Sequence, residues 1–179
     1  MSAGPERRAP DAPLPVYVAA GSNVAPLESL VRALTALAGR FPDLRVSPAY
    51  RNAAVGFEGE DFVNLALGFT TRLPLAGLLE ELHAVEALCG RGRGAPKYEP
   101  RRMDLDVLLY GDLVGDFPGA KLPRPDLTRR AFMLGPLADI AAGVVHPTLG
   151  ATIGELWARF DRARHPLERI ELPWPAPRP

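Results

Sequence analysis

Apolar and polar residues alternate along the chain in patterns that predict four strands. The apolar run VYVAA at 16–20 is typical of a buried strand, and LRVSPAYR at 44–51 indicates a second one. In FVNLALGFTT at 62–71, aliphatic residues occupy every second position, which predicts a strand with one aliphatic face. A fourth strand is predicted at 104–110, DLDVLLY, where two aspartates that flank a leucine are followed by an aliphatic run.

Two longer segments repeat leucine at helical spacing. Residues 26–39 begin with a proline suited to a first helical turn and end with a glycine, and residues 74–89 carry a leucine stripe. The order strand, helix, strand, strand, helix, strand predicts an α+β fold with a ferredoxin-like βαββαβ core, in which helices pack on an antiparallel sheet. Shorter C-terminal helices are predicted within 128–142 and 152–160.

Length and composition predict a single domain. The chain has 179 residues, and many of its 20 prolines lie near its two ends. We therefore expect one folded domain over residues 16–165, a disordered proline-rich tail over 1–15 and a second proline-rich tail over 166–179.

Charge and cysteine content narrow the class of protein. Lysine plus arginine and aspartate plus glutamate each number 21, so the net charge gives no sign of a nucleic-acid or membrane binder. The chain has no apolar run of the roughly 20 residues that span a bilayer and no signal-peptide pattern, which predicts a cytoplasmic protein. The single cysteine, Cys89, is interpreted as a buried, inert thiol.

Two aspartates stand at the start of the fourth predicted strand. Asp104 and Asp106 are two positions apart, so their side chains leave a strand on the same side, with Cα atoms about 6.5–7 Å apart. Two converging carboxylates need a compensating cation, and Mg²⁺ binds one or two carboxylates together with substrate phosphates. The alternative from the same residues is a structural ion network with Arg101 and Arg102.

A basic, glycine-rich segment, GRGRGAPKYEPRR at 90–102, precedes these aspartates. Its arginines match phosphate oxygens in shape and charge, which together with a carboxylate-bound metal favours a polyphosphate ligand. A solvated basic loop and a nucleic-acid patch are the alternatives.

On the strand at 62–71, Phe62 and Asn64 share the face opposite the aliphatic one. That face is suited to a flat polar heterocycle, or else is a partly exposed strand surface.

These segments together resemble one family in order along the chain. The segments VYVAAGSNVAP, SPAYRNAAVG, EDFVNLAL, GRGRGAPKYEPRRMDLDVLLYG and LPRPDLTRRAFMLGPLADIA, from about residue 16 to 160, are similar to 6-hydroxymethyl-7,8-dihydropterin pyrophosphokinases of folate biosynthesis. The resemblance implies an enzyme that transfers diphosphate from ATP, as co-substrate, to the pterin hydroxymethyl group with two Mg²⁺ ions and releases AMP. We expect this enzyme to be a monomer.

The resemblance also assigns roles to individual residues. Asp104 and Asp106 are implied metal ligands, and Arg91 and Arg101 join them as catalytic residues. The implied ATP contacts are Glu86, Arg91, Arg93, Tyr98, Arg101, Val107, Lys121, Leu122, Arg124 and Arg130. The implied pterin contacts are Asn52, Ala53, Val55, Phe62, Asn64 and Phe132. Arg124 departs from the family, which often has a histidine at that place.

The residues leave a second class of function open. A ferredoxin-like RNA-binding module would use the arginines of 91–102 and needs exposed aromatic residues on its central strands. The strand aromatics available for that role are Tyr17, Phe62, Phe69 and Tyr110. That interpretation gives no role to the two aspartates, because carboxylates on an RNA-binding face repel phosphate.

Overall fold

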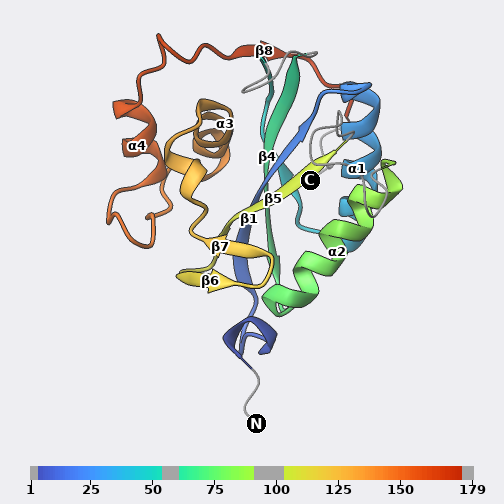
Figure 1. Ribbon diagram of the computed structural model, residues 1–179, viewed down its shortest axis with the longest axis vertical. Coiled ribbons are helices and arrows are strands. Elements are labelled where there is room, and N and C mark those ends of the chain that lie inside the picture. Colours follow the sequence, from blue (N-terminus) through green and yellow to red (C-terminus); the bar gives the residue numbers. More distant parts are fainter. Residues whose placement is uncertain (1–3, 54–60, 91–102, 175–179) are drawn as a thin grey trace.

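The structure is a computed structural model that describes residues 4–53, 61–90 and 103–174. Six strands of these segments form one antiparallel sheet in the order β5-β1-β4-β3-β8, with β2 also paired to β4 (Figure 1). They are β1 (Leu14–Ser22), β2 (Arg45–Val46), β3 (Ala49–Asn52), β4 (Phe62–Thr71), β5 (Asp104–Tyr110) and β8 (Glu168–Ile170). The order strand, helix, strand, strand, helix, strand from Leu14 to Tyr110, with β2 and β3 counted as one strand, confirms the predicted ferredoxin-like βαββαβ core.

Helices cover both faces of this sheet. In Figure 1, α1 and α2 lie on one side of the strands, and α3 and α4 lie on the other. The α-helices are α1 (Pro26–Arg40), α2 (Leu75–Leu88), α3 (Ala131–Ala141) and α4 (Ile153–Arg159). Short 3-10 helices are η1 (Pro5–Arg7) and η2 (Pro125–Thr128), and a small hairpin joins β6 (Gly115–Phe117) to β7 (Ala120–Leu122). No helix in these segments is long and apolar enough to cross a membrane.

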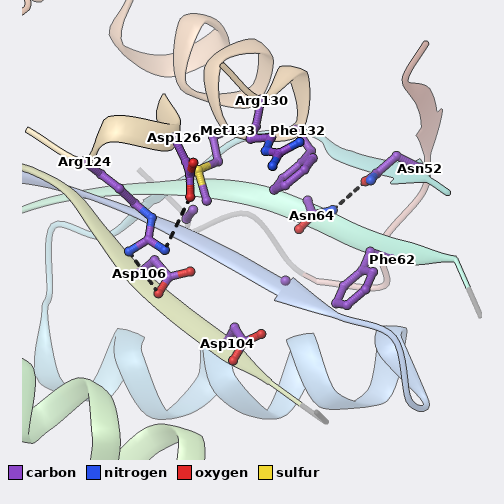
Figure 2. A pocket seen from close by; sticks show the side chains of 12 residues that line it. Asn52, Phe62, Asn64, Asp104, Asp106, Arg124, Asp126, Arg130, Phe132 and Met133 are labelled. Atoms are coloured by element: carbon purple, nitrogen blue, oxygen red, sulfur yellow. Dashed lines mark hydrogen bonds and ion pairs between the residues drawn. The ribbon is translucent and has the colours of Figure 1, made fainter. Parts of the chain in front are cut away.

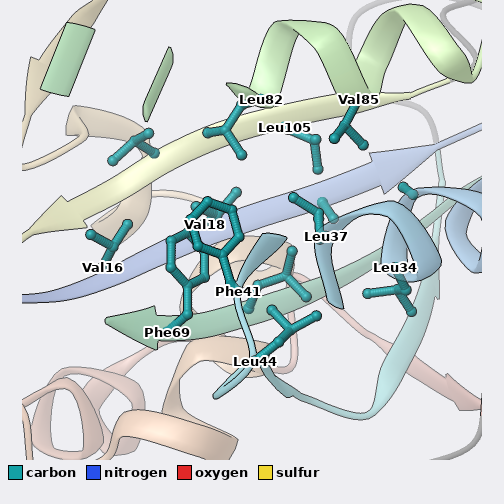
Figure 3. Packing of buried hydrophobic residues seen from close by; sticks show 14 of the residues in the cluster. Val16, Val18, Leu34, Leu37, Phe41, Leu44, Phe69, Leu82, Val85 and Leu105 are labelled. Carbon is teal, nitrogen blue, oxygen red and sulfur yellow. The ribbon is translucent and has the colours of Figure 1, made fainter. Parts of the chain in front are cut away.

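The larger apolar core lies between the sheet and the helices α1 and α2 (Figure 3). Leucines of both helix stripes enter it, and Phe41 and Phe69 stack there with ring centroids 4.0 Å apart. Cys89 belongs to this core, as predicted, and burial raises the pKa of its thiol. A second core on the other face packs α3 and α4 against alternate residues of the same strands.

The strand predicted at 44–51 is divided into β2 and β3. The break falls at Ser47 and Pro48, because the proline has no N–H with which to continue the ladder. Ser47 maintains the contact with β4 through its own groups: its N–H donates to Ala66 O at 2.9 Å, and its Oγ accepts from Ala66 N at 2.8 Å. The predicted bounds of the β4 and β5 strands agree with the structure.

Both expected tails contain regular structure next to the expected domain boundaries. Within 166–179, β8 pairs with the edge strand β3 through Ala49 and Ile170. Within 1–15, η1 contacts α2, and β1 begins at Leu14. The composition of these segments does not reveal this, because the short pairing of β8 depends on an edge that only the folded sheet provides. The β6–β7 hairpin was also not predicted.

Candidate active site

A cavity of about 320 Å³ opens on the α3 face of the sheet, where β1 ends and β4 and β5 begin (Figure 2). Strand register brings its lining together, since Gly21 pairs with both Asn64 and Asp104, and Ala19 pairs with Asp106. The lining residues are Ala19, Gly21, Asn52, Phe62, Asn64, Asp104, Asp106, Arg124, Asp126, Arg130, Phe132 and Met133.

Small residues of β1 form the floor of this cavity. A Cβ atom added at Gly21 would collide with Asn64 Oδ1, so the absence of a side chain at Gly21 makes room for the Asn64 amide. Ala19 lies two positions earlier on the same face. The central strand therefore leaves a space between the carboxylates of β5 and the amide of β4.

The two aspartates of β5 point into the cavity, as their spacing predicts, while Leu105 between them points into the core of the opposite face (Figure 2, Figure 3). Arg124 Nη1 lies 3.4 Å from Asp106 Oδ1, and Arg124 Nη2 lies 4.0 Å from Asp126 Oδ2. Within the described segments, Asp106 thus pairs with an arginine that follows β5. The ion network predicted with Arg101 and Arg102 stays a prediction, because both arginines are outside the described residues.

Arg124 is placed by its backbone. Its N–H donates to Leu108 O at 3.0 Å, which fixes the start of η2 beside β5. Its Nε is buried and has no hydrogen-bond partner among the described residues. A guanidinium has five N–H donors, so this side chain retains donor capacity inside the cavity.

An amide pair and two aromatic rings form the other end of the cavity. Asn64 Nδ2 donates to Asn52 Oδ1 at 2.5 Å, and Asn52 Nδ2 donates to Ala53 O at 3.1 Å. Figure 2 shows the rings of Phe62 and Phe132 on either side of Asn64. A flat molecule between these rings would meet amide donors and acceptors at its edge.

Helix α3 is tied to the sheet beside this cavity. Tyr50, which pairs with Asn64, donates a hydrogen bond to Asp139 Oδ2 of α3 at 2.6 Å. Burial and the Asp139 carboxylate together raise the pKa of Tyr50 to about 12, so the phenol stays a protonated donor near neutral pH. This contact helps to hold Phe132, on the first turn of α3, at the cavity.

Four residues expected at ATP do not line this cavity. Glu86, on α2, is buried beneath β5 and accepts a hydrogen bond from Leu105 N at 2.8 Å. Val107 and Leu122 are buried in the core on the α1 and α2 face. Lys121 lies on β7, with Nζ 3.8 Å from Asp116. Their contacts with ATP stay predictions.

Other sequence-predicted residues lie outside the described segments. They are Val55, Arg91, Arg93, Tyr98 and Arg101. Conversely, the structure adds Gly21, Asp126, Ala19 and Met133 to the cavity. The spacing of Asp126, two residues after Arg124, is the signal in the sequence for a shared ion-pair network.

The carboxylate pair fits a hard divalent cation. Asp104 and Asp106 provide oxygen donors on one strand face, and no group of three or more His, Cys, Asp or Glu side chains suited to a metal occurs within residues 4–53, 61–90 and 103–174. Mg²⁺ usually takes one or two carboxylates and completes its shell with water and substrate phosphates. The donor set therefore suits a metal that is shared with a phosphate ligand.

Comparisons with known proteins agree with this chemistry. The model of the 7,8-dihydro-6-hydroxymethylpterin-pyrophosphokinase family matches residues 17–142. A 2-amino-4-hydroxy-6-hydroxymethyldihydropteridine pyrophosphokinase of Pseudomonas aeruginosa is 40% identical over 161 residues, which cover 87% of this chain and 94% of the relative. The enzyme of the same name from Aquifex aeolicus is 35% identical over 134 residues, covering 74% and 83% of the two chains.

Solved structures support the fold independently. A crystal structure titled Plasmodium falciparum HPPK-DHPS wild type with SDX-DHP has a TM-score of 0.64 and 12% sequence identity. The match covers 82% of this chain but only 44% of that chain, so this chain spans less than half of the solved protein. At this identity the likeness concerns the fold alone.

Proposed function

The chain belongs to the 7,8-dihydro-6-hydroxymethylpterin-pyrophosphokinase family, and on that premise we propose that it makes the pterin diphosphate of folate biosynthesis. The reaction transfers the terminal diphosphate of ATP to the hydroxymethyl oxygen of 6-hydroxymethyl-7,8-dihydropterin. A bond forms between that oxygen and the β-phosphorus, the hydroxyl proton is released, the bond from the β-phosphorus to the oxygen bridging the α-phosphorus breaks, and AMP leaves with that oxygen.

The observation that carries this proposal is the content of the cavity. One end of the cavity carries the carboxylates of Asp104 and Asp106, and the other end carries the Asn64 amide and two aromatic rings. A phosphate donor needs the first feature and a flat heterocyclic acceptor needs the second. Their presence in one space of about 320 Å³ brings both substrates together, which is the main source of acceleration in phosphoryl transfer.

The pterin is proposed to lie between Phe62 and Phe132, with its edge toward Asn64. The hydrogen bond that Asn64 Nδ2 donates to Asn52 Oδ1 fixes the orientation of the Asn64 amide, and a fixed amide loses less entropy when it binds a ligand. Backbone groups of Asn52 and Ala53, together with Val55, complete the proposed pterin site. Ala53 and Asn52 also line a smaller adjoining cavity with Phe132.

The phosphates are proposed to lie at the other end. Asp104 and Asp106 would hold two Mg²⁺ ions. These ions would neutralise negative charge on the phosphate that is transferred. Arg130 and Arg124 line the same cavity and would bind the phosphate oxygens and balance charge in the transition state. Arg91, Arg93 and Arg101 are proposed as further phosphate contacts, and Glu86, Tyr98, Val107, Lys121 and Leu122 as contacts along ATP.

The proposed setting is a monomer in the cytoplasm that acts on small molecules. The similarity to bacterial pyrophosphokinases supports the small-molecule substrates of this setting. Size-exclusion chromatography with light scattering tests the monomer, since a mass near 19.3 kDa is expected.

One assay tests the reaction. The protein is incubated with ATP, Mg²⁺ and 6-hydroxymethyl-7,8-dihydropterin, and the nucleotide product is identified by chromatography. AMP in equal amount to pterin diphosphate is expected. ADP would instead indicate transfer of a single phosphoryl group, and an absence of nucleotide turnover would contradict the proposed function.

The RNA-binding alternative lacks most of the exposed strand aromatics that it requires. It needs exposed aromatic residues on the strands, but Tyr17, Phe69 and Tyr110 are all buried. Phe62 is the remaining candidate, and it lines the cavity beside the carboxylates.

A further inference from the structure

Arg124 lies between two carboxylates that belong to different elements. Asp106 is on β5, and Asp126 is the second residue of η2. The guanidinium uses one terminal nitrogen for each, at 3.4 Å and 4.0 Å respectively. All three side chains line the cavity, and about a third of the Arg124 side chain is exposed (Figure 2).

The Asp106 carboxylate thus has two competing uses. It is a proposed ligand of Mg²⁺, and the same carboxylate attracts a guanidinium in the protein without metal. A divalent cation bound to Asp106 would lie within a few ångströms of the Arg124 charge, and like charges at that separation repel. Metal binding must therefore weaken or break the contact between Arg124 and Asp106.

A released Arg124 has a defined place to go. Its backbone N–H stays bonded to Leu108 O, so the residue cannot leave the cavity wall. Its Nε has no hydrogen-bond partner in the described part of the chain, although it is buried. An anionic phosphate would satisfy that donor and replace the lost carboxylate, since guanidinium and phosphate match in charge and geometry.

We infer that Arg124 is an exchangeable counterion that occupies Asp106 in the metal-free protein and moves to the nucleotide phosphates when metal binds. The inference rests on the proposed metal site of the preceding section and adds a coupling between the two ligands. Asp126 is the positioning residue of this exchange, because it retains the guanidinium beside the cavity. Binding of metal and binding of phosphate then favour each other, since each removes a competitor of the other.

The two partners of Arg124 give opposite expectations for metal binding. Removing the guanidinium with Arg124→Gln takes away one positive charge that competes with the metal for Asp106, and should tighten metal binding. Removing its second carboxylate with Asp126→Asn leaves Arg124 with Asp106 alone and should weaken metal binding. In the double variant, Asp126→Asn should have no effect of its own, because the arginine through which it acts is gone.

The experiment measures Mn²⁺ binding to the full chain without nucleotide, by the loss of the free-Mn²⁺ signal in electron paramagnetic resonance. Mn²⁺ accepts the same carboxylate ligands as Mg²⁺. Arg129→Gln is the matched control, because Arg129 is exposed, carries the same charge and does not line the cavity. Thermal unfolding of each variant confirms that it is folded. For an ion pair of this exposure, Arg124→Gln should tighten Mn²⁺ binding by about two- to fivefold relative to the control.

The outcomes separate this inference from the proposed function. Equal Mn²⁺ affinity in Arg124→Gln and Arg129→Gln would overturn the exchange. A loss of affinity from Asp126→Asn that persists in the double variant would show that Asp126 acts by its own charge and not through Arg124. If neither the wild type nor Arg124→Gln binds Mn²⁺ saturably, the metal assignment fails together with the exchange, while formation of AMP tests the reaction separately.

Discussion

The two faces of the sheet differ although the same strands build both. On β5, Leu105 enters the apolar core under α1 and α2, whereas its neighbours Asp104 and Asp106 enter the cavity beside α3. On β1, Val18 and Ala20 enter the core, whereas Ala19 and Gly21 form the cavity floor. Large aliphatic side chains fill one face, whereas small residues at one end of the other face leave room for the cavity. Stability and chemistry are therefore assigned to alternate positions of the same strands.

The largest expected effect comes from the cavity face. Asp106→Ala should lower kcat by about a thousandfold or more, because the proposed metal loses one of its two carboxylate ligands. The midpoint of thermal unfolding should change little, because the Asp106 side chain is about a third exposed. Its loss also removes the repulsion between the carboxylates of Asp104 and Asp106. Initial rates of AMP formation and a thermal melt measure the two quantities. Retained activity would contradict the metal assignment.

The core face should behave in the opposite way. Leu34 of α1 is fully buried, so Leu34→Ala should lower the free energy of unfolding by about 2–5 kcal/mol. The kcat of the molecules that remain folded should be close to that of the wild type. Urea unfolding supplies the free energy. Leu88→Ala is the control, because Leu88 is 55% exposed and its loss should cost under about 0.5 kcal/mol. A large loss of kcat in folded Leu34→Ala would break the separation of the two faces.

A single methyl group tests the floor of the cavity. Gly21→Ala would place a Cβ against Asn64 Oδ1, so the amide must move from its hydrogen bond with Asn52. The KM for the pterin should rise by about ten- to a hundredfold, the worth of one misplaced hydrogen bond in a buried site, with a smaller change in the KM for ATP. Gly39→Ala, in α1 with open space around it, should leave both KM values unchanged. Equal rises for both substrates would argue against a pterin-specific role.

The smallest expected effect concerns the connection between α3 and α4, which cover the cavity face. His146 is buried, and its Nδ1 accepts from Thr148 N and Leu149 N, each at 3.3 Å. Burial lowers the pKa of His146, so the unfolded chain takes up a proton at a higher pH than the folded one. The contribution to stability is complete above the ordinary pKa of about 6.5 and is lost as the pH falls from there toward the lowered value.

His146→Asn provides the test of that pH dependence, because an amide oxygen can accept both N–H groups but does not titrate. The urea midpoint of the wild type should fall more steeply than that of His146→Asn as the pH drops below about 6.5. Parallel curves for the two proteins would show that another group is responsible for any acid sensitivity.

Local sequence patterns were sufficient to predict the bounds of a strand where the same alternation of apolar and polar residues continued along the whole strand. The alternation at 62–71 and the aspartate pair before the aliphatic run at 104–110 gave the bounds of β4 and β5. Local patterns failed where a partner strand decides the structure. Residues Glu168–Ile170 have no strand period of their own, and they are ordered by the free edge of β3.

By itself, the sequence determined the fold class and the family, because strand period, helix period and short motifs are all local properties of the chain. It also placed Asp104 and Asp106 on one side of a strand. Only the tertiary structure decided which side chains they meet. The pairing of Gly21 with both Asn64 and Asp104 joins the two ends of the cavity, and the contact of Arg124 with Asp106 depends on how η2 follows β5. Such contacts join residues whose separation in sequence does not predict their distance in space.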